Sequence, residues 1–376
     1  MKATIVLLPG DGIGPEVVDE ARRVVDDVAR LFGHQLRFDE HLIGGASIDA
    51  HGTALTDDAL AACRAADAIL LGAVGGPAWS DPTARVRPEQ GLLGLRKALG
   101  LWANLRPVRP FPELAACSPL RPELLAGVDV VVVRELTGGL YFGPRIRDVV
   151  DGRRRACDTL EYTDVEIARV VALAFRLAEH RRRRVTSIDK ANVLESSRLW
   201  RQVADEVGAR HPEIALDHQL VDSAAMRLIT APASFDVVVT ENMFGDILTD
   251  EAAVLAGSLG LCPSASIGDG RCGLYEPIHG SAPDIAGRGI ANPIGTILSA
   301  ALLLRHSLGL EREAQAIEGA VAQAIAAGVR TADIAPGPGD AVSTTRMGAE
   351  IRNHLHRTRP ARDASHYIDN QRSGAW

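Results

Sequence analysis

Three short, largely apolar runs that are rich in β-branched residues most constrain the fold of this 376-residue chain. They cover residues 4–8, 128–133 and 235–239, and a run without regular polar alternation is typical of a strand that is buried on both faces. Segments with helical periodicity separate these strands from other strand-like segments. Strands and helices therefore alternate along the chain, and this alternation predicts an α/β protein built around central sheets.

Further strands are expected at residues 36–42, 68–71 and 185–188, and Thr56 is predicted to cap a helix that ends at Ala65. The other predicted helices cover residues 15–32, 164–180, 193–207, 242–256, 295–309, 311–327 and 343–357. At about 100–200 residues per domain, the length of the chain suggests two domains. No internal repeat is visible.

The composition excludes several classes of protein. The chain has 48 acidic and 41 basic residues and a net charge of −7, so it offers no dominant basic block for nucleic acid. Its five cysteines are odd in number and form no CxxC pair, which predicts reduced thiols in a cytoplasmic protein. The first apolar run is broken at Pro9-Gly10, unlike a signal peptide, and no apolar stretch is long enough for a membrane span.

Only three of the basic residues are lysines: Lys2, Lys97 and Lys190. Lys190 lies in the segment Ser187-Ile188-Asp189-Lys190-Ala191-Asn192, between a predicted strand and a predicted helix. A buried amine has a lowered pKa and becomes able to accept a proton, whereas arginine stays protonated. Lys190 is therefore a candidate general base, and an ion pair with Asp189 or another acid is the alternative.

Arg96, Arg106 and Arg134 form a candidate anion site. Arg134 ends a buried strand, where an unpaired charge is costly and where α/β proteins bind ligands. Three guanidiniums suit a substrate with two carboxylates, because each can donate two parallel hydrogen bonds. The alternative is that each arginine pairs with a surface acid. Tyr141 follows a glycine pair and is either a proton donor or a structural tyrosine.

A set of carboxylates suggests a metal site. Asp246 and Asp250 are four residues apart and share one face of a predicted helix, while Asp222 follows the strand-like segment 214–220. Three carboxylates with open positions suit Mg²⁺ or Mn²⁺, which prefer oxygen ligands. The alternative for the Asp246–Asp250 pair is a solvated helix face.

Two glycine-containing segments suggest a nucleotide site. Residues 276–293 are rich in glycine, proline and small residues, and we expect a long binding loop there. A carboxylate at Asp284 suits a pair of ribose hydroxyls and would repel a 2′-phosphate, which favours NAD over NADP. Gly10-Asp11-Gly12-Ile13-Gly14 places its third glycine one residue too early for the standard dinucleotide fingerprint. We expect a tight strand-to-helix turn near a cofactor instead.

Taken together, these segments resemble the β-decarboxylating dehydrogenases, the family of isocitrate, homoisocitrate, tartrate/D-malate and isopropylmalate dehydrogenases. The resemblance runs from Leu7 to about residue 355. It is carried by Asn104-Leu105-Arg106, Tyr141, Asp189-Lys190-Ala191-Asn192, Phe244-Gly245-Asp246 and His279-Gly280-Ser281-Ala282-Pro283-Asp284. The segment Glu89-x-Gly91-Leu92-Leu93-x-x-Arg96 resembles the isopropylmalate branch, in which Leu92 and Leu93 would receive the alkyl group of the substrate.

The resemblance implies a role for each matching residue. Tyr141 and Lys190 would be the catalytic acid and base. The substrate would contact Leu92, Leu93, Arg96, Arg106, Arg134 and Asp222. The metal would be held by Asp222, Asp246 and Asp250. NAD would contact Glu276, His279, Gly280, Ser281, Ala282, Pro283, Asp284, Ile285 and Asn292.

The implied activity is the NAD-dependent oxidative decarboxylation of 3-isopropylmalate, a 2-hydroxy dicarboxylate, to 4-methyl-2-oxopentanoate and CO₂ in leucine biosynthesis. A related 3-alkylmalate, D-malate, tartrate or homoisocitrate remains an alternative substrate. Two other classes also remain open. A metal-dependent lyase without redox chemistry would not require the loop at 276–292, and a non-catalytic regulatory subunit would be expected to lack some of the functional residues.

The resemblance also implies two α/β domains with a shared central sheet, not a standard Rossmann fold. Residues 1–101 with 257–360 would form a discontinuous NAD-binding domain, and residues 102–256 would form the catalytic and dimerisation domain. Residues 361–376 would be a tail. The segment of about 140–160, with its turn at Asp151-Gly152, would be the arm of a homodimer, in which Lys190 and Asp222 enter the neighbour's active site.

Overall fold

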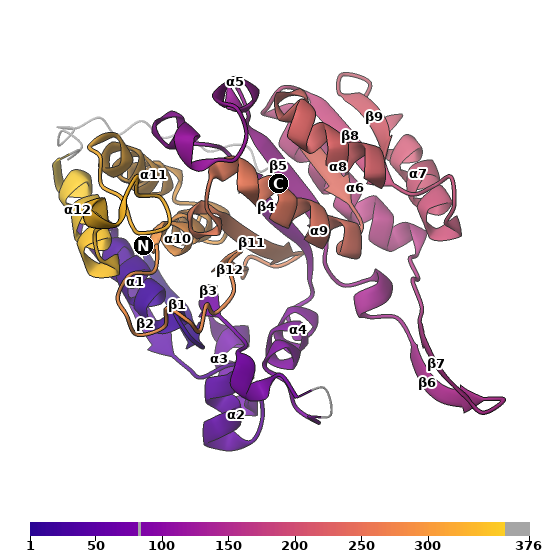
Figure 1. The fold of residues 1–376 in the computed structure, drawn as a ribbon, viewed down its shortest axis with the longest axis horizontal. Coiled ribbons are helices and arrows are strands. Elements are labelled where there is room, and N and C mark those ends of the chain that lie inside the picture. Colours follow the sequence, from indigo (N-terminus) through magenta and orange to yellow (C-terminus); the bar gives the residue numbers. More distant parts are fainter. Residues whose placement is uncertain (82–83, 358–376) are drawn as a thin grey trace.

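The structure is a computed structural model that describes residues 1–81 and 84–357. One sheet of ten strands crosses it in the order β2-β1-β3-β12-β11-β4-β5-β10-β8-β9 (Figure 1). The strands are β1 (Lys2–Gly10), β2 (Gln35–Glu40), β3 (Ala68–Ala73), β4 (Leu101–Val108), β5 (Val130–Glu135), β8 (Arg184–Asp189), β9 (Ala215–Leu220), β10 (Val237–Thr240), β11 (Pro263–Gly268) and β12 (Leu274–Pro277).

The sheet has two parallel flanks and an antiparallel centre. β2, β1, β3 and β12 are parallel to one another, and so are β5, β10, β8 and β9. Between these flanks, β11 is antiparallel to β12 and to β4, and β4 is antiparallel to β5. The prediction of an α/β protein with a shared central sheet is confirmed, and the antiparallel centre distinguishes the fold from a standard Rossmann fold.

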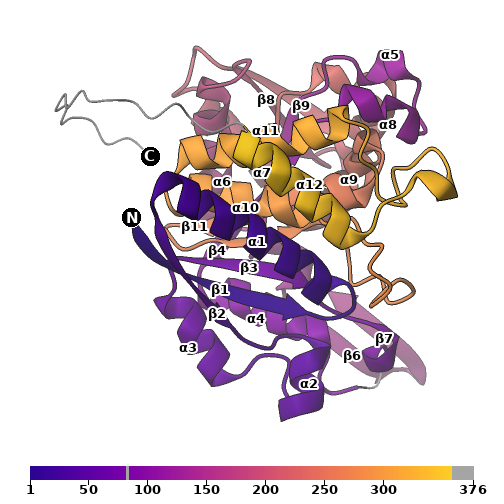
Figure 2. The same cartoon turned by 90° about the vertical axis from the view of Figure 1, so that its left-hand side faces the viewer.

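Helices cover both faces of the sheet. They are α1 (Gly14–Phe32), α2 (Gly45–His51), α3 (Asp57–Ala65), α4 (Pro88–Ala98), α5 (Pro122–Leu125), α6 (Asp164–Glu179), α7 (Glu195–Gly208), α8 (Val221–Thr230), α9 (Asn242–Ala253), α10 (Ile294–His306), α11 (Glu311–Ala326) and α12 (Thr344–Arg357). In Figure 2, α1, α10, α11 and α12 lie above β1 and β3, and α2 and α3 lie below them. The predicted helices are confirmed to within a few residues, and Thr56 caps α3 by accepting a hydrogen bond from the Ala59 amide.

The side chains of each buried strand alternate between two hydrophobic clusters. In β1, Ile5 and Leu7 pack into the cluster that contains α1 and α10, whereas Val6 and Leu8 pack against α3 and α4. This alternation follows from the two-residue period of a strand. It explains why the segment is apolar throughout, since both of its faces are covered.

A separate hairpin of β6 (Arg145–Val150) and β7 (Arg153–Asp158) projects from the main sheet, at the lower right of Figure 1. Its turn is formed by Asp151 and Gly152, which have positive φ angles of 51° and 73°, as a two-residue hairpin turn requires. Three apolar side chains of β6 are exposed to solvent: Ile146, Val149 and Val150. Two strands alone are marginally stable in water, so this hairpin calls for a covering surface.

The segment 276–293 differs in one respect from the expected loop. Glu276 lies in β12 and is buried, while residues 278–293 form neither helix nor strand. The predicted tail, 361–376, lies outside the described residues. A membrane-crossing helix is not found among residues 1–81 and 84–357, because no helix there combines the required length with sufficient hydrophobicity.

Candidate active site

Ten of the predicted site residues line one cavity of about 430 Å³. It lies where β3, β4, β5 and β12 meet α4, α9 and the turn that carries Tyr141. Those that line it are Leu92, Leu93, Arg96, Arg106, Arg134, Tyr141, Asp246, Glu276, His279 and Gly280. Glu89, Arg145 and Ser264 also line it and were not assigned a role from the sequence.

The sheet places Arg106 and Arg134 side by side. Asn104 of β4 pairs directly with Arg134 of β5, and Arg106 lies two residues further along β4. Because residues two apart in a strand share a face, as do paired residues in neighbouring strands, all three side chains leave the same face of the sheet. All three are buried. The sheet therefore brings two of the three predicted arginines, Arg106 and Arg134, together on one face.

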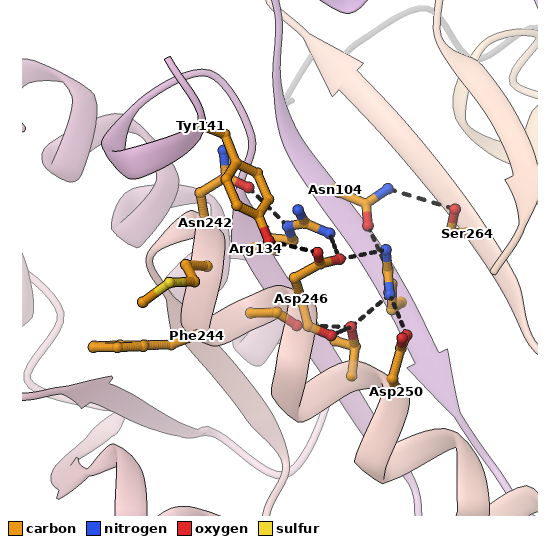
Figure 3. A network of polar contacts seen from close by, with 12 residues as sticks. Asn104, Arg134, Tyr141, Asn242, Phe244, Asp246, Asp250 and Ser264 are labelled. Atoms are coloured by element: carbon orange, nitrogen blue, oxygen red, sulfur yellow. Dashed lines mark hydrogen bonds and ion pairs between the residues drawn. The ribbon is translucent and has the colours of Figure 1, made fainter. Parts of the chain in front are cut away.

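The carboxylate of Asp246 lies at the centre of a polar network (Figure 3). It forms an ion pair with Arg134, lies 3.7 Å from Nη2 of Arg106, and accepts a hydrogen bond of 2.8 Å from the Tyr141 hydroxyl. Burial alone would raise the pKa of Asp246, but these three partners together hold it below its usual value of 3.8. Asp246 is therefore an anion at neutral pH.

The two buried guanidiniums make the cavity suitable for an anion. Burial, and then repulsion from Arg106, lowers the pKa of Arg134 to about 10, and burial also lowers the pKa of Arg106. Arg134 stays largely protonated at neutral pH even so. Arg106 is further fixed by hydrogen bonds to Asn104 Oδ1 at 2.8 Å and Thr249 Oγ1 at 2.5 Å. A ligand with carboxylates would offset the mutual repulsion of these cations.

Tyr141 is placed to donate a proton. Burial, followed by the hydrogen bond to Asp246, raises the pKa of its hydroxyl to about 12. The phenol is therefore protonated throughout the physiological range. The guanidinium of Arg134 lies 5.8 Å from the centre of the Tyr141 ring, in the geometry of a cation–π contact.

Asp246 and Asp250 provide an oxygen donor set that fits Mg²⁺ or Mn²⁺. Both contact Arg106, with Asp250 Oδ1 lying 3.2 Å from Nη1, so the predicted placement on one face of α9 is confirmed. The side chain of Asp250 is 66% exposed and keeps its oxygens accessible. Carboxylate oxygens are the ligands that these ions prefer.

Lys190 and Asp222 do not line the cavity of their own chain. The Lys190 amine lies 2.8 Å from Asp222, and this contact lowers the pKa of the Asp222 carboxylate. Lys190 was expected to be buried, but its side chain is 25% exposed because it follows the last residue of β8. Asp189, the other acid that sequence reasoning considered as its partner, instead accepts two hydrogen bonds from Arg201.

Among residues 1–81 and 84–357, one group of three potential ligands has its donor atoms within 4.8 Å of one another. It consists of Glu179, His211 and Glu213. Asp222, Asp246 and Asp250 are thus not gathered within one chain.

An ion pair joins the predicted substrate segment to the predicted cofactor segment. Arg96 of α4 and Glu276 of β12 are both buried, and their Nη2 and Oε1 atoms lie 2.6 Å apart. The backbone beyond Glu276 also lines the cavity, through Gly280. A ligand in this cavity would therefore contact α4 and the start of the 278–293 loop together.

The 278–293 loop packs against the glycine turn that follows β1. The Ile13 amide donates to the Ser281 carbonyl at 2.9 Å, and a Cβ atom on Gly12 would come within 2.0 Å of the same oxygen. The ring of His279 is partly buried, which lowers its pKa, and its buried Nε2 atom has no hydrogen-bond partner among the described residues. A close approach of two backbones beside an unpartnered polar atom fits a polar cofactor such as a nucleotide.

The remaining predicted cofactor residues have different surroundings. Ala282 and Ile285 are partly buried against Ile13, whereas Pro283 and Asp284 are exposed. Asn292 is buried, and its side chain accepts from the Ile294 amide and donates to Asp333. In this chain Asn292 therefore holds the start of α10.

Sequence reasoning missed the role of Asp11. Its buried carboxylate accepts hydrogen bonds of 2.7–2.8 Å from the amides of Gly45, Ala46 and Gly75. It thereby holds the start of α2 and the loop after β3 beside the glycine turn. An acid between two glycines at the end of a buried strand is a signal that would have singled it out.

The comparisons define the class of protein first. The family model described as isocitrate/isopropylmalate dehydrogenase matches residues 4–351, and the chain belongs to this family. It is thus an enzyme of the decarboxylating dehydrogenase type, which argues against the redox-free lyase.

Within this family, the chain is similar to several 3-isopropylmalate dehydrogenases. The chain is 69% identical to the 3-isopropylmalate dehydrogenase of Anaeromyxobacter dehalogenans, over 94% of this chain and 100% of that protein. It is 58% identical to the 3-isopropylmalate dehydrogenase of Shouchella clausii, over 92% of this chain and 96% of that protein. The crystal structure of isocitrate dehydrogenase from Methylococcus capsulatus is 35% identical and superposes with a TM-score of 0.83, over 94% of this chain and 99% of that one.

Proposed function

We propose that the chain catalyses the NAD-dependent oxidative decarboxylation of 3-isopropylmalate to 4-methyl-2-oxopentanoate and CO₂, a step of leucine biosynthesis. The observation that carries the proposal is the cavity that Arg96, Arg106 and Arg134 share with Leu92 and Leu93. The arginines suit the two carboxylates of a malate, and the leucines suit an alkyl substituent. Isocitrate would bring a third carboxylate to the leucines, where burial without a partner is costly.

Asp246 and Asp250, with the partner's Asp222, would hold Mg²⁺ or Mn²⁺ beside the bound substrate. Residues of the 276–292 segment would hold NAD, with the unpartnered Nε2 atom of His279 as one polar contact. The bound metal would lower the pKa of the substrate hydroxyl, and NAD⁺ would provide the hydride acceptor.

The chain's own residues would move two protons. The amine of Lys190, reaching the cavity from the partner subunit, would accept the proton of the substrate hydroxyl directly or through water. Tyr141, which is protonated at neutral pH, would donate a proton to the carbon that loses CO₂. Arg96, Arg106 and Arg134 would hold the carboxylates in place throughout, because their charges are fixed.

A homodimer is part of the proposal. Apolar side chains of α8 and α9 are 47–63% exposed, namely Met226, Ile229 and Ile247, and the β6–β7 hairpin exposes further apolar side chains. Burying such a surface against a second copy is favourable. A second copy would also bring Lys190 and Asp222 to a cavity that they do not line in their own chain.

The proposed domains are residues 1–101 with 257–360, and residues 102–256 with the hairpin as arm. The supporting feature is the centre of the sheet, where β11 of the first domain pairs with β4 of the second.

The cytoplasm is the proposed location, because the five cysteines are free thiols.

The test is the absorbance of reduced nicotinamide with purified enzyme, Mg²⁺ and 3-isopropylmalate. Malate, tartrate, isocitrate and homoisocitrate are the competing substrates, and NADP⁺ is the competing cofactor. We expect the highest kcat/KM for 3-isopropylmalate with NAD⁺, and loss of activity with a chelator that added Mg²⁺ or Mn²⁺ reverses. A preference for unsubstituted malate would contradict the proposal.

A further inference from the structure

The carboxamide of Asn242, the first residue of α9, contacts two parts of the site at once. Its Oδ1 atom accepts a hydrogen bond of 3.0 Å from Nε of Arg134, and its Nδ2 atom donates one of 3.1 Å to the Gly138 carbonyl. Figure 3 shows Asn242 beside Arg134 and Tyr141. The side chain is buried, so water does not replace either bond.

Both contacts lead directly to groups of the proposed reaction. With Nε of Arg134 held by Asn242, its Nη1 atom pairs with Asp246. Gly138 precedes the short 3₁₀ turn Gly139–Tyr141, so its carbonyl lies at the base of the turn that carries the Tyr141 phenol. One carboxamide therefore restrains both the rotation of Arg134 and the position of Tyr141.

The backbone of Asn242 is itself held firmly. Its amide donates to the Tyr162 hydroxyl at 3.0 Å, and that hydroxyl lies 3.2 Å from Glu135 and 3.3 Å from Glu241. Glu241 caps α9 by accepting from the amides of Met243 and Phe244. Asn242 is therefore a fixed point against which Arg134 and the Tyr141 turn are aligned.

Asparagine is the residue type that this position requires. The carboxamide accepts from a guanidinium on one side and donates to a carbonyl on the other. Aspartate would keep the acceptor and lose the donor, and leucine would keep the approximate shape and lose both.

We infer that Asn242 is a positioning residue of the reaction: it orients Arg134 for the substrate and, through Gly138, orients Tyr141 for protonation of the product carbon. The inference rests on the proposed function. The two contacts of the Asn242 side chain should have two different effects on the reaction. The Arg134 contact would act on substrate binding, and the Gly138 contact would act on proton donation.

The test compares Asn242→Leu and Asn242→Asp with Ser307→Ala. The control loses two buried hydrogen bonds, to the Gly273 amide and the Tyr275 hydroxyl, outside the cavity lining. Each enzyme turns over 3-isopropylmalate with NAD⁺ in D₂O, and the product is trapped at once as leucine by reductive amination. NMR then reports which of the two C3 hydrogen positions carries deuterium.

We expect wild type and Ser307→Ala to give one deuterated form, because the enzyme delivers the proton to one face. For Asn242→Asp we expect a KM within about 3-fold of wild type, a kcat lower by roughly 10–100-fold, and a mixture of deuterated forms. For Asn242→Leu we expect the same mixture with a KM that is also raised roughly 10-fold or more. Melting temperatures show whether each variant is folded.

The inference is overturned if either folded Asn242 variant keeps the kcat, the KM and the single deuterated form of the control. A wild type that does not reduce NAD⁺ with 3-isopropylmalate would instead contradict the proposed function. In that case the KM and kcat comparison is repeated with the 2-hydroxy acid that the enzyme does oxidise, and retention of both by the variants overturns the inference about Asn242.

Discussion

At the scale of single residues, the negative charge of Asp246 lies between the positive charges of Arg106 and Arg134. Two arginines and a phenol surround this carboxylate, and their combined effect on its pKa exceeds the effect of burial. A metal ion that binds Asp246 must therefore compete with these partners, whereas Asp250 is more exposed and more accessible. The two aspartates thus differ in accessibility, although both lie on the same face of α9.

Lys190 provides a direct test at this scale. We expect Lys190→Ala to lower kcat roughly 10²–10⁴-fold, the range of a general base. Lys190→Arg should be similarly impaired, because a guanidinium does not release its proton at neutral pH. Lys97→Ala, a change of an exposed lysine in α4, is the control and should keep wild-type kcat. Near-wild-type turnover by Lys190→Ala would reject the proposed base.

Tyr141 makes a prediction about pH. Its pKa is raised to about 12, so the donor form is complete below pH about 10 and is lost as the pH rises toward 12. We expect no fall in kcat from Tyr141 ionisation between pH 7 and about 9. Tyr141→Phe should lower kcat at every pH with a smaller effect on KM. A kcat profile of wild type and variant checks this, and a variant with unchanged kcat would exclude Tyr141 as the acid.

At the scale of secondary-structure elements, the strands that consist of apolar runs were predictable, and three strands that carry buried polar residues were not. β1, β3, β5 and β10 are buried on both faces and confirm the prediction from their apolar runs. β4, β11 and β12 were missed because they carry buried polar residues such as Asn104, Ser264 and Glu276, of which Ser264 and Glu276 line the cavity. A pattern of apolar residues cannot reveal a strand whose buried side chains are polar.

The same limit applies to the four consecutive arginines 181–184. A run of arginines just after a helix is typical of a solvated surface, but Arg181 pairs with both Asp129 and the buried Asp236. Those partners lie far along the chain and become neighbours only in the folded sheet. The set of Arg96, Arg106 and Arg134 was easier to predict, because the resemblance to a family supplied a common ligand that spacing alone does not.

The N-cap of α3 gives a prediction about this element. Thr56 Oγ1 accepts from the Ala59 amide at 3.2 Å, so Thr56→Ala should lower the free energy of unfolding by about 1 kcal/mol. Thr53→Ala is the control, because the Thr53 hydroxyl donates to the Leu55 carbonyl and caps no helix. Denaturant unfolding curves, fitted with one common slope of free energy against denaturant concentration, measure the free energy of unfolding of both variants. An equal loss in the two variants would contradict a capping contribution.

At the scale of the whole molecule, the proposed homodimer makes each active site a product of two chains. A mixture of Lys190→Ala and Arg134→Ala subunits would then contain heterodimers with one intact site. Random assembly predicts recovery of roughly a quarter of wild-type activity. Lys190→Ala mixed with Asp222→Ala is the control and should recover none, because both residues come from the same side of the interface. Recovery in neither mixture would argue against shared sites.

The order of the strands in the sheet also affects how the chain folds while it is being synthesised. Ile69 of β3 pairs with Leu274 of β12, which the ribosome adds about 200 residues and roughly 10–40 s later. During that interval the apolar β3 lacks one neighbour, and an open strand edge favours aggregation. The strands between residues 101 and 240 are all synthesised before β12. Both β1–β3 and the strands between residues 101 and 240 can therefore pair among themselves before β11 and β12 join the two groups at the centre of the sheet.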